Sequence, residues 1–329
     1  MIQFVLRRLL ATVPVLLGVT FLVVAATKLI PGSPGSMRGE KLTKTEIAAI
    51  DAKYGYDRPI VVQYVAYVGR VARGDLGESW VHSGRPVRDE LRERFPATIE
   101  LACCSMLIAT FAGVLLGVVA AVRPRGPVDW AIMTFALVGL SMPVFWLGVL
   151  LQIEFPIAQR VELLTDPSDF AWSGFYVVDA IHARDVDRLA EVLKHLLLPS
   201  IVLATIPLAT IARLTRASLL EALQQDYVRT ARAKGLAPTA VVLKHGLRNA
   251  LIPIVTALGL QLAALLGGAI LTETVFSWPG VGSYIYEAAT NKDLPALQGA
   301  VLIVSLVYIV ANLVVDVSYA LIDPRVRVE

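Results

Sequence analysis

The sequence predicts an all-α polytopic membrane protein with six transmembrane helices. Hydrophobic residues make up 56% of the 329-residue chain and charged residues only 17%, below the roughly 25% of a soluble domain. A helix needs about 20 mostly apolar residues to cross a bilayer. Helices are the expected spanning form because lipid offers open backbone groups no hydrogen-bond partner. The six runs that approach this length lie at roughly 9–30, 98–122, 130–153, 196–212, 250–272 and 298–322.

The first run is expected to be an uncleaved helix rather than a signal peptide. Arg7 and Arg8 precede it, as basic residues do in a signal peptide. However, the run is longer than the apolar region of about 7–15 residues found in signal peptides, and no A-x-A-like site follows. Pro31 and Pro34 in "IPGSPG" end the helix, because proline lacks the backbone N–H that a helix interior requires.

The basic residues of the short connections predict the orientation. They lie at 7–8, 123–125, 213–248 and 325–327, and six spans place all four regions on one side of the membrane. Basic residues mark the cytoplasmic side, so both termini are expected in the cytoplasm. The opposite connection, 154–195, carries eight acidic residues against four basic ones. It is therefore expected to be external.

A second external connection, 31–96, is expected to form a structured cap on the membrane helices rather than an independent enzyme. Its last part, "RPVRDELRERF", predicts a short charged helix. Oppositely charged residues three or four positions apart meet on one face of a helix. The pairs with this spacing are Asp89 with Arg92 and Glu90 with Arg94.

A basic stretch interrupted by glycine and proline separates the fourth and fifth runs. Span four is expected to continue as a helix to Gly235, a residue that commonly follows a helix C-terminus, and a short helix restarts with Pro238 in its first turn. The resulting helical hairpin contains a run of small residues that would let another protein approach closely: Thr230, Ala231, Ala233 and Gly235. The alternatives are charges that only set topology, and a polybasic contact with lipid.

This stretch resembles the cytoplasmic coupling loop of ABC-importer permeases. The general pattern of that loop is Glu-Ala-Ala followed by Gly after three residues, whereas this chain has Arg229, Thr230 and Ala231 before Gly235. "DYVRTARAKGL" and "HGLRNALIP" are similar to the version found in the peptide/nickel branch. The resemblance covers nearly the whole chain, through "FVLRRLLATVPVLLGVTF", "YGYDRPIVVQY", "GDLGESW", "PATIELA", "SMPVFWLG", "LTETVFSWPGVG" and "NLVVDVSYALIDPRVR".

Two segments depart from the pattern of the branch. Ser33 stands where P-G-D-P has Asp, and "EFPIAQRVELL" replaces a W-x-P-x-x-G stretch that often follows span three. The outer end of span three is therefore expected to differ. Otherwise the chain is most similar to the first permease subunit of dipeptide importers.

The resemblance implies a single transmembrane domain, 1–329, with a type I ABC-importer permease core, an external loop at 31–96 and a cytoplasmic coupling loop at 213–249. The chain would form half of the pathway for dipeptides or short peptides in a bacterial inner membrane. The implied partners are a second homologous permease subunit, two ABC ATPases and an external binding protein. The residues expected to couple to the ATPases are Arg229, Thr230, Ala231, Arg232, Ala233, Lys234, Gly235 and Leu236.

The chain is expected to bind no cofactor itself. It has no G-x-x-x-x-G-K-[ST] phosphate-binding loop, so ATP and Mg²⁺ would be bound by the partner ATPases. Cys103 and Cys104 are adjacent and show no metal-binding spacing. No nucleic acid is expected among the partners, which otherwise include the lipid bilayer.

Polar residues within the spans are the candidates for the transport pathway or its gate, because they are costly in lipid and usually face protein or water. They are Gln261, Thr272, Glu273, Asn312 and Asp316. Glu273 could meet the ammonium group of a peptide, act as a gate, or contact another subunit. Asn312 and Asp316 could equally form interhelical hydrogen bonds or contact a partner subunit.

The same sequence features are compatible with other functions. Within the same family, the substrate could be nickel, glutathione or an antimicrobial peptide. A secondary transporter is a weaker alternative because the six spans show no inverted repeat. A membrane enzyme is weaker still, because no Ser/His/Asp or H-E-x-x-H arrangement occurs.

Overall fold

A computed structural model describes residues 2–27, 57–82, 84–155 and 173–322, together with 43, 45, 49, 52 and 55. Nearly all of these residues are helical, and the only strand-like pairing among them is an isolated bridge between Glu78 and Pro86. The prediction of an all-α protein is therefore confirmed. The chain divides into two compact units, one built from 1–98 and 279–329 and the other from 99–278.

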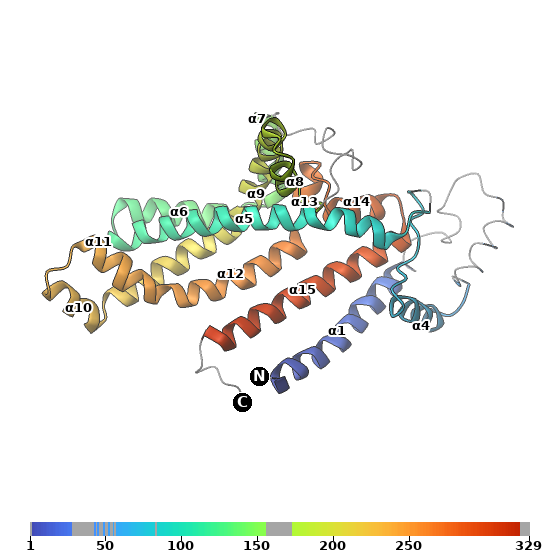
Figure 1. Ribbon diagram of the computed structural model, residues 1–329, viewed down its shortest axis with the longest axis horizontal. Helices are drawn as coiled ribbons and strands as arrows, with labels where there is room; N and C mark the ends of the chain where they lie inside the picture. The colour runs from blue at the N-terminus through green and yellow to red at the C-terminus, as the bar shows by residue number, and fades with distance from the viewer. Residues whose placement is uncertain are drawn as a thin grey trace. The chain divides into compact units, whose positions relative to one another are not determined.

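The first unit joins the two ends of the chain. Helix α1 (Ile2–Thr27) packs against α15 (Leu294–Ile322) and against the shorter α4 (Ile60–Val71) (Figure 1). Helix α14 (Val281–Thr290) packs on α15, and α5 (Val87–Val122) begins in this unit. Segments separated by more than 200 residues in sequence therefore share one core.

The buried carboxylate of Asp293 fixes the start of α15. One oxygen accepts from the backbone N–H of Ala296, which satisfies a free donor in the first turn of the helix. The other oxygen accepts from the Ser79 hydroxyl at 2.6 Å and from the backbone N–H groups of Trp80 and Val81. The loop before α5 is thereby held to the start of the last helix.

The structure does not form the salt bridges expected from sequence spacing in the helix that follows this loop. Asp89 pairs with Arg88 at 3.4 Å rather than with Arg92, and Glu90 does not pair with Arg94. Glu90 is buried and lies 3.0 Å from Nδ1 of His82, while Arg94 lies 3.7 Å from Glu287 and places its guanidinium 5.0 Å from the centre of the Tyr284 ring. Burial raises the pKa of Tyr284, and the nearby Glu90 carboxylate acts in the same direction. Contacts with the preceding loop and with α14 replace the local i,i+4 pairing.

The charged segment is also not a separate helix. Helix α5 runs without interruption from Val87 to Val122 and contains Pro96. Val87 and Leu91 are buried, which fixes the first turns in place before the proline. Ala97 and Leu101 are buried after the proline, and this packing on both sides of Pro96 lets the helix continue, although proline removes one backbone hydrogen bond.

The second unit is arranged around one long helix, α9. Its main helices are α6 (Pro127–Ser141), α7 (Val144–Glu154), α8 (Tyr176–Ala183), α9 (Val186–Leu223), α12 (Arg248–Gly268) and α13 (Ile270–Val275). Helices α6, α7, α8, α12 and α13 all pack against α9.

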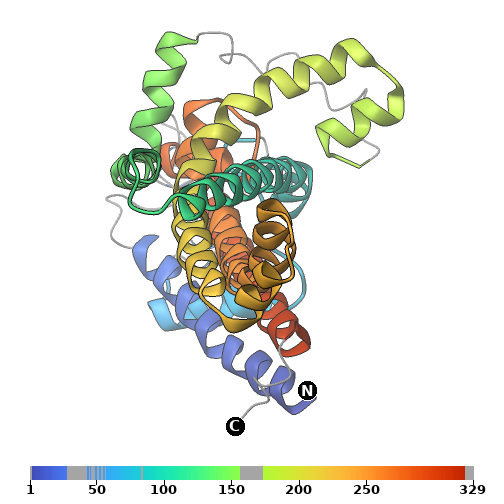
Figure 2. The same cartoon turned by 90° about the vertical axis from the view of Figure 1, so that its left-hand side faces the viewer.

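Helices α6 and α7 form one apolar segment with a bend of 102°. In Figure 2, α6 is seen nearly end-on and α7 rises away from it (green). The last bond of α6 runs from the N–H of Met142 to the carbonyl of Val138, and Pro143 has no N–H with which to continue the helix. Pro143 therefore interrupts the span that the sequence predicts at 130–153.

Close packing and an ion pair fix the C-terminal part of α9 to α5 and α6. A Cβ atom on Gly117 of α5 would lie 2.5 Å from Cβ of Thr215, so only glycine allows this approach. Beside it, the Arg216 guanidinium donates to both carboxylate oxygens of Asp129 at 2.5 and 2.7 Å. The N–H of Arg125 donates to the same carboxylate at 2.8 Å.

The described residues account for up to five membrane spans. Three unbroken helices are long and apolar enough, within Val87–Val122, Val186–Leu223 and Leu294–Val315. The bent pair α6–α7, and a second bent segment that joins Pro238–Leu251 to Pro253–Gly267, could each form one more. The apolar part of α1, Leu10–Ala26, is shorter than these. The count of six therefore stays a prediction.

Candidate coupling segment and transport cavity

The predicted coupling loop folds as a bent helical segment, called the elbow below, over residues 224–247. The expectation of one continuous helix from span four to Gly235 is wrong. Helix α9 ends at Leu223, Gln225 takes an extended conformation with ψ of 151°, and α10 (Asp226–Ala233) starts in a new direction. The break lets α10 fold back toward the helices that it connects, as Figure 1 shows at the left.

The turn at Gly235 has the geometry that the sequence predicted. Gly235 has a left-handed φ of 75°, and its N–H donates to the carbonyl of Arg232 at 3.0 Å. The N–H of Leu236 donates to the carbonyl of Ala231 at 3.4 Å, which satisfies carbonyls left free at the end of α10. The chain then restarts as a helix in α11 (Pro238–Ala240), with Pro238 in the first position.

One side of the elbow is a small hydrophobic core. Val228, Ala231 and Val241 are buried together, with Leu223 packed against them. Ala231 therefore faces inward, unlike the other seven residues expected to couple to the ATPases. Those seven are all exposed: Arg229, Thr230, Arg232, Ala233, Lys234, Gly235 and Leu236.

The elbow ends in a π-helix, η4 (Val241–Leu247), which continues directly into α12. Gly246 lies within it, and a Cβ atom there would approach the side chains of Leu219 and Leu223 of α9 to 2.8 and 3.0 Å. Short π-helical segments are rare in proteins, and those that occur are often found at functional sites. This close contact ties the elbow to the ends of both α9 and α12.

The exposed side of the elbow is basic. Arg229, Arg232 and Lys234 stand against one acidic residue, Asp226, and the pair between Asp226 and Arg229 is open to solvent. Exposed pairs of this kind contribute little to stability, so these charges remain available to a partner. The elbow therefore combines an apolar core with an exposed basic side.

The pathway candidates do not form one cluster. Gln261 and Thr272 line the same cavity of about 360 Å³ in the second unit, between the bend of α6–α7 and the junction of α12 and α13. Glu273 is fully buried next to Thr272 but is not among the residues that line this cavity. Its backbone carbonyl accepts from the N–H of Trp278 at 2.8 Å.

The two candidates on α15 belong to the first unit. The amide nitrogen of Asn312 donates to the carbonyl of Tyr308 one turn earlier, at 3.0 Å. This bond lies within a single helix, so the roles considered for Asn312 stay predictions. Asp316 lies in the same helix, and its side chain is outside the described residues.

The remaining lining of the cavity is apolar and was not predicted. It is formed by Pro143, Val144, Phe145, Leu203, Ile206, Pro207, Ala264, Leu265 and Leu271. Among these residues only Pro143 and Pro207 are conspicuous in the sequence, because proline interrupts or bends a helix. Apolar residues that face a cavity cannot be distinguished in sequence from those that face lipid.

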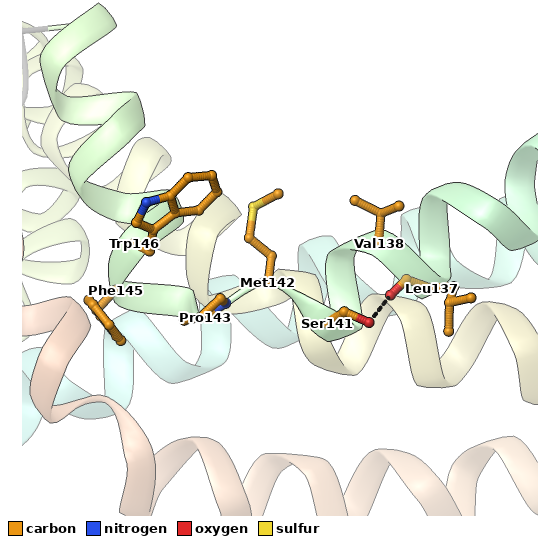
Figure 3. Close-up of a pocket in the computed structure, with 7 residues that line it drawn as sticks. All are labelled: Leu137, Val138, Ser141, Met142, Pro143, Phe145 and Trp146. Atoms are coloured by element: carbon orange, nitrogen blue, oxygen red, sulfur yellow. Dashed lines mark hydrogen bonds between the residues drawn. The ribbon is translucent and has the colours of Figure 1, made fainter.

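A wider and more open groove lies at the bend itself. It has a volume of about 590 Å³ and is lined by Leu137, Val138, Ser141, Met142, Pro143, Phe145 and Trp146. Figure 3 shows Met142 and Trp146 projecting to one side of the bend and Phe145 to the other. The Ser141 hydroxyl donates to the carbonyl of Leu137 at 2.9 Å, so the groove presents an almost entirely apolar surface.

These features define a helical membrane transport subunit. Its spans contain a cavity with polar groups, and a folded basic elbow connects α9 to α12. The chain belongs to the family described as the binding-protein-dependent transport system inner membrane component, which matches residues 113–328. The N-terminal domain of the same kind of transport component matches residues 1–102.

Named relatives align along the whole chain. The di/tripeptide transport system permease protein DppB of Pseudomonas aeruginosa is 44% identical over 99% of both chains. The dipeptide transport system permease protein DppB of Escherichia coli K12 is 43% identical over 99% of both chains. The glutathione transport system permease protein GsiC of Salmonella choleraesuis is 41% identical, again over 99% of both.

Proposed function

We propose that this chain is the permease subunit of an ABC importer for dipeptides or short peptides, and that it works in a bacterial inner membrane. The family and the named peptide permeases among the relatives support this function. The observation that carries it is the alignment along 99% of both chains, since it includes the elbow and both sides of the cavity. The chain is a transport subunit rather than an enzyme.

The exposed side of the elbow would dock on a cytoplasmic ATPase. Seven exposed residues, three of them basic, lie over a buried apolar core that keeps their arrangement rigid. Two ABC ATPases would bind ATP and Mg²⁺, a second homologous permease would complete the pathway, and an external binding protein would deliver the peptide. Both termini and the elbow would then lie in the cytoplasm, in agreement with the distribution of basic residues.

A glutathione permease is the second candidate function. The relative named for glutathione transport is 41% identical, only three percentage points below the first di/tripeptide permease (44 − 41 = 3). Overall identity therefore does not separate the two substrates. Both candidates predict the same complex and the same dependence on ATP.

Reconstitution tests the proposal. The chain would be assembled with its second permease, its ATPases and its binding protein in proteoliposomes, and uptake of labelled dialanine and labelled glutathione would be compared. We expect dialanine uptake that requires ATP. Uptake driven by a proton gradient without the ATPases would refute the class of transporter. ATP-dependent uptake of glutathione but not dialanine would favour the second candidate.

A further inference from the structure

The cavity between α7, α9, α12 and α13 contains two polar side chains without a hydrogen-bond partner in the described part of the chain, Gln261 and Thr272. Thr272 is only 2% exposed. In contrast, the hydroxyls of Thr205 and Thr274 each donate at 2.8 Å to a carbonyl of their own helix. Thr272 lies two residues from Thr274 and lines the cavity.

Unpartnered polar groups in apolar helices need an explanation. Polar residues within membrane helices are costly in lipid and usually serve a pathway or a binding site. The cavity lies between two breaks, the bend at Pro143 and the junction of α12 with α13. Interrupted helices at membrane depth occur where they line a cavity, and transporters use them to bind substrates.

The chemistry of the lining indicates the class of ligand. A carboxamide offers two donors and an acceptor, and a hydroxyl offers one donor and accepts as well. A peptide bond presents one N–H donor and one carbonyl acceptor, so it matches these two groups. None of the described residues that line the cavity is charged or carries an imidazole or a thiol, and those are the ligands that nickel prefers.

The apolar part of the lining suits variable side chains. Phe145, Leu203, Ile206 and Leu271 form walls without polar atoms in their side chains, so they contact side chains of different shapes through dispersion and burial alone. The volume of about 360 Å³ falls in the range of about 300–1,000 Å³ for small-molecule sites. Such a site recognises the main chain, which is the same in all peptides, and does not select among their different side chains.

We propose that this cavity binds the main chain of a peptide in transit, with Gln261 and Thr272 hydrogen-bonding its peptide bond and the apolar walls accepting its side chains. This inference rests on the proposed function. Two neutral hydrogen bonds give a weak contact, and weak contacts suit a pathway because the substrate must also leave. The external binding protein would set which peptides enter, and the cavity would only require a peptide bond.

Two nearly isosteric variants test the proposal in the reconstituted complex. Thr272→Val and Gln261→Leu each remove the hydrogen-bonding group and keep most of the volume. With saturating, loaded binding protein, we expect each to reduce the dialanine imported per ATP hydrolysed by roughly three- to tenfold, the effect of one neutral hydrogen bond. The matched control is Thr205→Val, whose hydroxyl is already bonded within α9, and it should import as the wild type does.

A second substrate separates peptide binding from a purely structural role. An ester analogue of dialanine lacks the N–H of the peptide bond but keeps its carbonyl. At full occupancy of the binding protein, the wild type should import the ester several-fold more slowly than the amide. At least one of the two variants should show a smaller difference in import rate between amide and ester. That variant lacks the side-chain oxygen that accepts from the peptide N–H, which only the amide has.

Three results would overturn the inference. They are wild-type import by both variants, an equal loss for amide and ester in both variants, and equal wild-type import of amide and ester. The last comparison needs no variant, so it decides the matter even if the substitutions prevent assembly. Failure of the wild-type complex to import either ligand would instead refute the proposed function.

Discussion

The turn at Gly235 gives the sharpest prediction for the elbow. Its φ of 75° lies in the left-handed region, where an L-residue costs roughly 1–2 kcal/mol more than glycine. A Cβ atom at this position would meet nothing within 4 Å. The effect of a substitution therefore comes from backbone conformation alone, and the size of the side chain is not limited by neighbours.

The expected magnitude follows from this strain. A change of about 1–2 kcal/mol lowers the population of the native turn relative to its alternatives by a factor of about 5–30. If the backbone relaxes instead, the long bond from the N–H of Leu236 to the carbonyl of Ala231 is the first to be lost. We expect import per ATP hydrolysed to fall in the order Gly235, Gly235→Asn, Gly235→Ala, Gly235→Val, because asparagine tolerates positive φ best and β-branched residues tolerate it least.

The assay is the ATP-dependent uptake of dialanine alongside phosphate release in proteoliposomes. Gly69→Ala is the matched control, because Gly69 is helical, has no positive φ and has no atom within 4 Å of an added Cβ. It should leave the ratio of import to hydrolysis unchanged. A Gly235→Val complex that keeps the wild-type ratio would refute both the strain argument and the proposed role of the elbow in coupling.

Two further predictions concern the packing of α9. Gly117→Val should destabilise the complex by about 1–3 kcal/mol, because its Cβ would lie 2.7 Å from the carbonyl oxygen of Ala212 and 2.5 Å from Cβ of Thr215. Asp129→Asn should destabilise it by about 2 kcal/mol, less than the roughly 3–5 kcal/mol for a fully buried pair, because the Arg216 side chain is 28% exposed. The thermal unfolding midpoint of the purified complex measures both.

Each of these variants has a control in the same chain. Gly139→Ala adds a methyl group to a helical glycine with no atom within 4 Å and should not lower the midpoint. Asp226→Asn removes a carboxylate that is 93% exposed in its pair with Arg229, and exposed pairs are nearly neutral. Midpoints for Gly117→Val or Asp129→Asn that equal those of their controls would show that these contacts do not hold α9 in place.

The sequence predicts the local features of the elbow and misses its tertiary ones. Gly235 and Pro238 were identified because turn and cap preferences depend on a few neighbouring residues. The break at Gln224–Gln225 was not, because glutamine is a good helix former. The chain bends there so that Val228 and Ala231 can be buried against Val241, a contact between residues on two sides of a turn.

The same limit applies to the cavity. Gln261 and Thr272 could be selected singly, because polar residues are conspicuous in an apolar span. These two residues line one cavity with Phe145 and Ile206 because α6 and α7 are bent by 102° and because α9 packs against both α7 and α12. The proline at the bend was visible in the sequence, but the angle of the bend is set by tertiary packing. Likewise, the partner of Arg94 lies on α14, 193 positions later (287 − 94 = 193).

The elbow and the cavity are connected by two continuous helices. Helix α9 carries Leu203, Ile206 and Pro207 into the cavity and ends at Leu223, against the elbow. Helix α12 carries Gln261 and continues directly from η4. Pro207 lies 16 residues before the end of α9, or about 24 Å at 1.5 Å per residue, and prolines are the usual sites of helix bending. A displacement of the elbow would therefore act at Pro207, inside the cavity wall, and would change the spacing of the groups that we propose bind the peptide.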